Sequence, residues 1–230
     1  GSEMCIRDSQ WPDSEVYVHA SSGQTLSGSE TRNLNRAYPG KANGNLTEMI
    51  AYGITTLINE EDIDITVDLH EASPEYTTVN AIVAHENAIE LANMALWDVE
   101  DYFSISIEKS PTNLHGLTHR ELGDYTNTLA LLMETANASQ GRLHGAIHSS
   151  LVVDGVDKFY ARAAQYGAVT VPFGEDGIGI TERCARHISC LVAFCDEYLP
   201  EDDLYISLGD MPSFDEMVEN GIGAYLHSPE

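Results

Sequence analysis

Three short segments of this sequence carry side chains that could perform hydrolytic chemistry together. Asn35 and Arg36 place an amide beside a guanidinium group, whose planar fork of donors binds carboxylates. His70 follows an apolar stretch and offers an imidazole nitrogen, which binds Zn²⁺ well. Glu134 follows another apolar stretch and offers a carboxylate that can act as a general base. A metal ligand, a carboxylate-binding pair and a base are the groups that a metal-dependent amide hydrolase requires.

Each of these residues also has a simpler structural interpretation. His70 could be a strand-end histidine held by a hydrogen bond, and Glu134 could cap the turn after its strand. Arg36 could form a loop salt bridge, because the chain has 37 acidic and only 11 basic residues. For His70 alone the structural interpretation is the better one, but the order of the three segments favours the chemical one. Asp68 is one strand alternation from His70 and could help to organise the site.

The sequences of these three segments resemble those of the zinc carboxypeptidase superfamily, and most closely those of its succinylglutamate desuccinylase/aspartoacylase branch. They read NLNRAYPG (33–40), DLHEA (68–72) and LLMETAN (131–137), and the resemblance runs from about residue 16 to residue 199. The resemblance implies that Asn35 and Arg36 bind a substrate carboxylate, that His70 is a zinc ligand and that Glu134 is the general base. It implies a zinc hydrolase that cleaves an amide bond in an N-acyl amino acid or a short peptide with a free carboxylate.

One part of the family pattern is missing. The family normally places a His-x-x-Glu pair, which supplies two zinc ligands, upstream of the Asn-Arg pair. Here only His19 precedes Asn35, and the residue three positions later is Ser22. Residues 1–9 resemble a cloning remnant followed by the adapter peptide that contaminates metagenomic assemblies. We therefore expect a truncated N-terminus, weakly bound or absent Zn²⁺, and impaired activity.

Two alternatives to this interpretation remain open. The chain could be a non-catalytic module that binds an acidic small molecule through Asn35 and Arg36 without a metal. The missing zinc ligands could also come from a second chain or from the C-terminal tail. Zinc content separates these alternatives, because a binding module needs no metal.

Composition limits the possible partners. The net charge of −26 makes nucleic acid an unlikely ligand, because phosphate contacts need Lys and Arg. No apolar run approaches the roughly 20 residues of a membrane span. We expect a small carboxylate-bearing substrate, no nucleic acid, no membrane, and possible self-association where a lost N-terminal strand would have packed. Cys184, Cys190 and Cys195 are expected to be core residues of one helix in a reducing compartment, which favours the cytoplasm.

Hydrophobic patterns predict an α/β fold with a mixed, twisted sheet, helices on both faces, and the first strands missing. We expect one domain at residues 10–200 and an acidic tail at 201–230 packed on it. The predicted strands are residues 15–19, 63–70, 79–84, 103–107, 128–133 and 168–171. The predicted helices are residues 47–58, 87–102, 151–166 and 181–199. His70 and Glu134 should both lie at the carboxyl ends of strands, where ligands gather in such folds.

Two local features complete these expectations. Thr47 is predicted to cap the first helix, whose apolar face would contain Met49, Ile50, Ile54, Leu57 and Ile58. A polar segment before Glu134 could be a loop over the cleft or an ordinary surface loop, and it contains His115, His119, Arg120, Glu121 and Tyr125.

Overall fold

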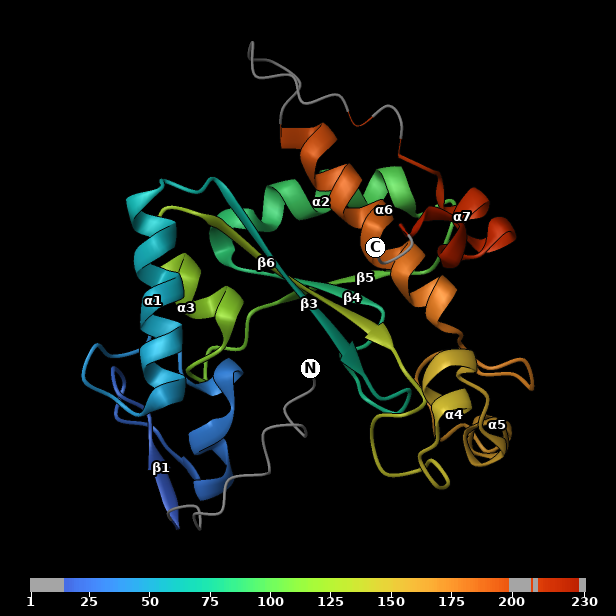
Figure 1. The fold of residues 1–230 in the computed structure, drawn as a ribbon, viewed down its shortest axis with the longest axis horizontal. Helices are drawn as coiled ribbons and strands as arrows, with labels where there is room; N and C mark the ends of the chain where they lie inside the picture. Colours follow the sequence, from blue (N-terminus) through green and yellow to red (C-terminus); the bar gives the residue numbers. More distant parts are fainter. Residues whose placement is uncertain (1–14, 199–207, 209–210, 228–230) are drawn as a thin grey trace. The chain divides into compact units, whose positions relative to one another are not determined.

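The computed structural model describes residues 15–198, 208 and 211–227 (Figure 1). The chain forms two compact units. The first contains the described residues of 1–68, 84–89 and 109–132, and the second contains those of 69–83, 90–108 and 133–230. Both predicted domain boundaries, after residues 9 and 200, lie outside the described residues.

The α/β class is confirmed by a four-stranded sheet with the order β3-β6-β4-β5. Its strands are β3 (Ile65–Ala72), β4 (Ala81–Ala84), β5 (Ser106–Lys109) and β6 (Leu129–Ala136). A separate antiparallel pair is formed by β1 (Val16–Val18) and β2 (Thr25–Ser27). Five of the six predicted strands are therefore present, with ends shifted by up to three residues.

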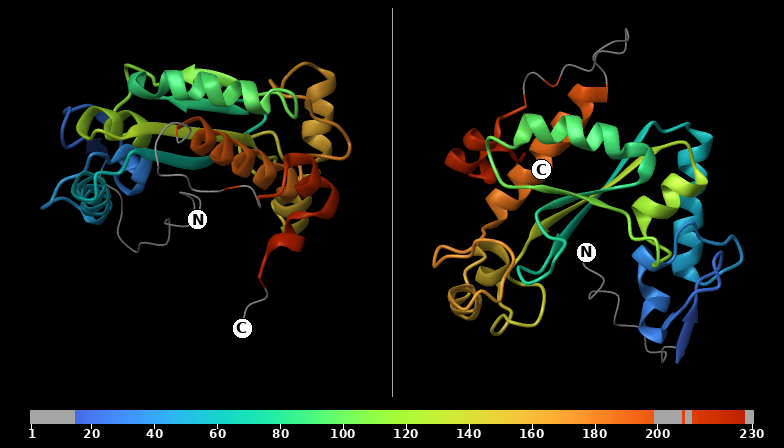
Figure 2. Two further views of the ribbon diagram at one scale, coloured as in Figure 1. Left: turned by 90° about the horizontal axis from the view of Figure 1, so that it is seen from above. Right: turned by 180° about the vertical axis from the view of Figure 1, so that it is seen from behind.

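Strand directions show that the sheet is mixed. Leu129 donates to the carbonyl of Asp64, and Asn137 donates to that of Ala72, so β3 and β6 advance together and are parallel. By contrast, His85 just after β4 donates to Ala130 near the start of β6, so β4 runs against β6. In the second unit, α2 and α6 lie on opposite faces of the strands (Figures 1 and 2).

The described residues form seven α-helices. They are α1 (Leu46–Glu60), α2 (Ile89–Val99), α3 (Thr118–Tyr125), α4 (Ser149–Asp154), α5 (Lys158–Gln165), α6 (Ile180–Tyr198) and α7 (Phe214–Asn220). The prediction for α6 is confirmed, and its cysteines are free. α7 was not predicted; it packs on α6 and buries Met217 completely, so part of the tail does pack on the second unit. None of the described helices is long and apolar enough to cross a membrane.

The predicted cap of α1 is wrong, and its predicted apolar face is buried only in part. Asn45, not Thr47, caps the helix: its side chain accepts from the backbone of Glu48, and the Glu48 carboxylate accepts from the backbone of Asn45. The buried residues then follow from Glu48 at helical spacing through Ala51, Thr55 and Ile58. Of the predicted face, Ile58 is buried and Ile54 packs against the core of the first unit. Its other members, Met49, Ile50 and Leu57, are exposed.

The predicted helix over residues 151–166 is broken into α4 and α5 at Gly155. This residue ends α4 in the left-handed conformation, with φ of 67°. Its carbonyl accepts from Ile178, and a Cβ at position 155 would lie 1.9 Å from the carbonyl oxygen of that residue. Asp157 then starts α5 by accepting from the backbone of Phe159 and Tyr160.

Gly155→Ala is expected to lower the free energy of unfolding by about 1–3 kcal/mol, because alanine is strained at positive φ and would clash with the Ile178 backbone. Gly53→Ala is the matched control, since Gly53 lies within α1 and a Cβ there meets nothing within 4 Å. That control should be neutral or stabilising by up to about 1 kcal/mol. Urea unfolding of both variants checks this prediction, and equal stability of the two would contradict it.

The predicted strand at residues 168–171 is absent from the described residues. Thr170 donates from its backbone to the carbonyl of Pro74, so this apolar segment bonds to a loop and not to the sheet. Its apolar character is explained by burial, because Val171 belongs to the core of the second unit. That core also contains Ala72, Val79, Ala136, Ala138, Leu151, Tyr160, Phe173 and Ile178.

Candidate functional site

The structure brings two of the predicted site residues together in the second unit. Nδ1 of His70 lies 4.0 Å from Oε1 of Glu134, although the two residues are far apart in sequence. This proximity follows from the parallel pairing of β3 with β6. Both side chains are partly exposed, at 24% and 20%, so water can reach part of each, whereas Oε2 of Glu134 is buried.

The predicted position of these residues at strand ends needs a correction. β3 continues to Ala72 and β6 continues to Ala136, so His70 and Glu134 each lie two residues inside their strands. Pairing between the strands explains the extension, because Asn137 still donates to the carbonyl of Ala72. A position inside a paired strand fixes both backbones more firmly than a strand end would.

Polar contacts, two of them from the buried side chains of Arg183 and Asn137, hold the end of β3 in place. Glu71 accepts hydrogen bonds from the guanidinium of Arg183, at 2.6 Å, and from the amide of Asn137, also at 2.6 Å. The ring of His187, on α6, hydrogen-bonds the backbone of His70. Burial lowers the pKa of His187, although the Glu71 charge opposes this shift, and the ring therefore stays neutral near pH 7.

In the first unit, Asn35 is bound to the start of α3. Its side-chain oxygen accepts from both the backbone and the hydroxyl of Thr118, at 2.7 and 2.9 Å. The same hydroxyl lies 2.6 Å from a carboxylate oxygen of Asp68. Burial raises the pKa of the Tyr38 phenol, and the Asp68 charge raises it further. Asp68 therefore has a structural role, because it contacts the same Thr118 hydroxyl as Asn35 does.

The contacts of Arg36 give only weak support to its interpretation as a loop salt bridge. Its Nη1 donates to the carbonyl of Asn35 at 2.5 Å, and its Nε lies 3.9 Å from Oε2 of Glu30. The second separation is too long for a hydrogen bond, and the Arg36 side chain is 23% exposed. The guanidinium can therefore still bind a carboxylate of a ligand.

A third group was not predicted from the sequence. His19, His115 and Glu121 of the first unit each offer a ligand atom within 4.8 Å of the others and could hold a metal ion. His19 follows β1, whereas Glu121 lies in the first turn of α3, so the predicted loop before Glu134 contains a helix with buried polar residues. No His-x-x-Glu spacing marks this group, because its members come from segments distant in sequence.

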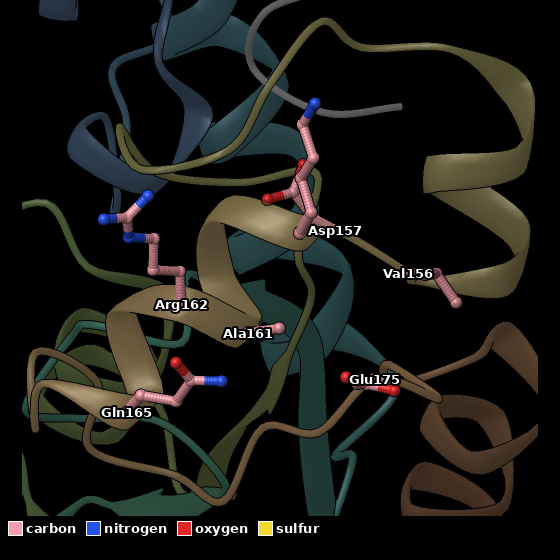
Figure 3. Close-up of a pocket in the computed structure, with 7 residues that line it drawn as sticks. Val156, Asp157, Ala161, Arg162, Gln165 and Glu175 are labelled. Atoms are coloured by element: carbon pink, nitrogen blue, oxygen red, sulfur yellow. The ribbon is translucent and has the colours of Figure 1, made fainter.

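A pocket of about 450 Å³ lies elsewhere in the second unit, against α5 (Figure 3). Figure 3 shows Arg162 and Gln165 on the helix, with Glu175 on a facing loop. The pocket is large enough for a small ligand. None of the four predicted site residues lines it.

Comparisons with known proteins leave the family unassigned: no family model, no curated protein and no solved structure matches the chain.

Proposed function

We propose that this chain carries part of the catalytic centre of a zinc-dependent hydrolase, with Glu134 as the general base and His70 as a metal ligand. The observation that carries the proposal is the 4.0 Å separation of the two side chains on adjacent strands. A base near a metal ligand, on a firmly paired sheet and open to solvent, is an arrangement suited to hydrolysis.

Glu134 would perform the proton transfers of amide cleavage. Its carboxylate removes a proton from a water molecule as the water oxygen attacks the carbonyl carbon. The C–N bond then breaks, and Glu134 returns the proton to the departing amine nitrogen. The products are a carboxylic acid and an amine, and the enzyme carboxylate is regenerated.

Zinc fits only in part around His70. Catalytic zinc sites use three protein ligands, and within the described residues no third histidine, cysteine or carboxylate gathers with His70 and Glu134. Two further ligands would have to come from outside the described residues or from a second chain.

The proposed substrate is an N-acyl amino acid or a short peptide with a free carboxylate. The free carboxylate of the substrate is inferred from the family resemblance of the Asn35-Arg36 segment. It is also inferred from the guanidinium of Arg36, which is 23% exposed and only loosely paired with Glu30. A guanidinium discriminates strongly between a carboxylate and its neutral amide, because only the carboxylate accepts two charge-assisted hydrogen bonds.

The test is hydrolysis of N-acetyl amino acids, and of the same compounds with an amidated carboxyl group, with zinc in excess. We expect slow, zinc-dependent turnover of the acids. Arg36→Ala should raise their KM by about tenfold or more, from the loss of a charged hydrogen bond. The KM of the amides should not change. Arg142→Ala, at an exposed arginine, is the control and should leave both KM values unchanged.

Equal effects of Arg36→Ala on acids and amides would show that Arg36 is structural. The hydrolase would be contradicted if no turnover were seen although the unsubstituted chain binds carboxylates and Arg36→Ala does not. That result would support the alternative function, a non-catalytic module that binds an acidic small molecule through Asn35 and Arg36. The loose Arg36–Glu30 pair is the observation that favours this alternative.

A further inference from the structure

We infer that His19, His115 and Glu121 form a zinc site of their own, separate from His70, which ties the turn after β1 to the start of α3. These three groups were not part of the sequence-based site, and all belong to the first unit. The site is a stabilising cross-link within that unit.

The hydrogen bonds of His19 leave one nitrogen in the form that binds a metal. Its Nε2 lies 2.6 Å from the carbonyl oxygen of Tyr38, so Nε2 carries the proton and donates. Nδ1 therefore keeps its lone pair, which accepts from the hydroxyl and backbone of Ser22. A metal-binding histidine usually donates its other N–H to a carbonyl or carboxylate in this way. His19 is 1% exposed, so its ring is fixed by packing as well.

His115 and Glu121 complete a donor set of two imidazoles and one carboxylate. Nδ1 of His115 lies 2.9 Å from Oε1 of Glu121, and the His115 and His19 rings stack with centroids 5.7 Å apart. Glu121 is 1% exposed, and a buried carboxylate favours a nearby positive charge. Arg120 supplies this charge only in part, because its Nε is 3.9 Å from Glu121 and its Nη1 donates to the carbonyls of Pro111 and Leu114.

The backbone around these ligands is held by other contacts. The Gln24 side chain accepts from the backbone of His115 and donates to the carbonyl of Asn113, joining the turn after β1 to the segment before α3. Gly116, at φ of 86°, packs so closely on Arg36 that a Cβ would lie 2.3 Å from that backbone. The ligands therefore sit on a scaffold that is formed before any ion binds.

This set of donor atoms favours zinc over harder cations. Two histidines and a glutamate are a known zinc set, whereas Ca²⁺ and Mg²⁺ prefer sites made only of oxygen ligands. Tetrahedral zinc needs donors about 3.3 Å apart, as follows from bonds of about 2.0 Å. The three donors lie within 4.8 Å, so a small closure suffices, and the 30% exposed side chain of His115 has room to make it.

Zinc titration by calorimetry, with thermal unfolding alongside, tests the inference. We expect one equivalent of zinc in the unsubstituted chain. At a hundredfold excess over Kd, zinc should raise Tm by roughly 5–10 °C, whereas Ca²⁺ and Mg²⁺ should not. His115→Ala and Glu121→Gln should weaken zinc binding at least tenfold and remove the Tm shift; His115 is chosen over the buried His19 so that the variant still folds.

His85→Ala is the matched control. His85 also pairs with a carboxylate in the first unit, Asp124 at 3.1 Å, but it belongs to no cluster of three ligands among the described residues. Its loss should leave zinc binding unchanged. His70→Ala should also keep this site, whatever its effect on turnover, which separates failure of this inference from failure of the proposed hydrolase. Absence of zinc binding, equal binding in His115→Ala, or loss in His70→Ala alone would overturn the inference.

Discussion

Replacing Arg183 by methionine is expected to lower the free energy of unfolding by about 2–4 kcal/mol, because two buried carbonyl groups lose their hydrogen-bond donors. The Arg183 side chain is 3% exposed and joins three parts of the second unit. Besides its bond to Glu71, it donates to the carbonyls of Ile178 and Val152, at 2.9 and 2.8 Å. Methionine fills similar space but leaves both buried carbonyls without these donors.

Arg186→Met is the matched control, one helical turn away on α6. Arg186 pairs with Glu182 at 2.9 Å, lies over the Phe103 ring and is more exposed, at 12%. Its loss should cost about 1 kcal/mol, which is usual for a partly exposed pair and a cation–π contact. Urea unfolding measures both. Equal losses in the two variants would show that the Arg183 network does not stabilise the end of β3.

Glu134→Gln is expected to lower kcat for N-acetyl amino acids by about 10²–10⁴, the usual contribution of a positioned base. Glutamine keeps the size of the side chain but cannot accept and return the proton. Substrate KM and the amount of zinc bound should stay nearly unchanged, because the base needs to bind neither.

Glu90→Gln makes the same chemical change at an exposed position of α2 and should leave kcat unchanged. Steady-state kinetics at several zinc concentrations therefore separates a lost base from a lost metal. Retained turnover in Glu134→Gln would remove Glu134 from the mechanism, and a higher zinc concentration needed for turnover would make it a ligand.

Local patterns in the sequence were enough to predict the elements that carry His70 and Glu134. The apolar, β-branched run before His70 and the apolar run before Glu134 each form a strand, because such side chains fit a paired and buried backbone. The helical spacing of Cys184, Ile188 and Leu191 was likewise enough to predict α6. Strand pairing then placed His70 and Glu134 close together, although both lie two residues inside their strands.

Features that depend on distant contacts could not be predicted in this way. The cap of α1 is an exception, because the glutamate three residues after Asn45 is a local signal that favours Asn45 over Thr47. α3 has a low apolar content, so it resembled a loop. The burial of its Glu121 is explained by contacts with His115 and with the backbone of Gly116. His19 belongs to the same cluster through long-range packing, which no local spacing records.

The most direct test of the proposed function is zinc-dependent turnover of an N-acetyl amino acid by His70→Ala, measured beside His115→Ala. His70 is the ligand assigned to the hydrolytic centre, whereas His115 is assigned to the separate zinc site of the first unit. We predict that His70→Ala loses the turnover and that His115→Ala keeps it at temperatures where the variant is folded. Turnover that survives in His70→Ala, or that is lost only in His115→Ala, would contradict the assignment of hydrolysis to His70 and Glu134.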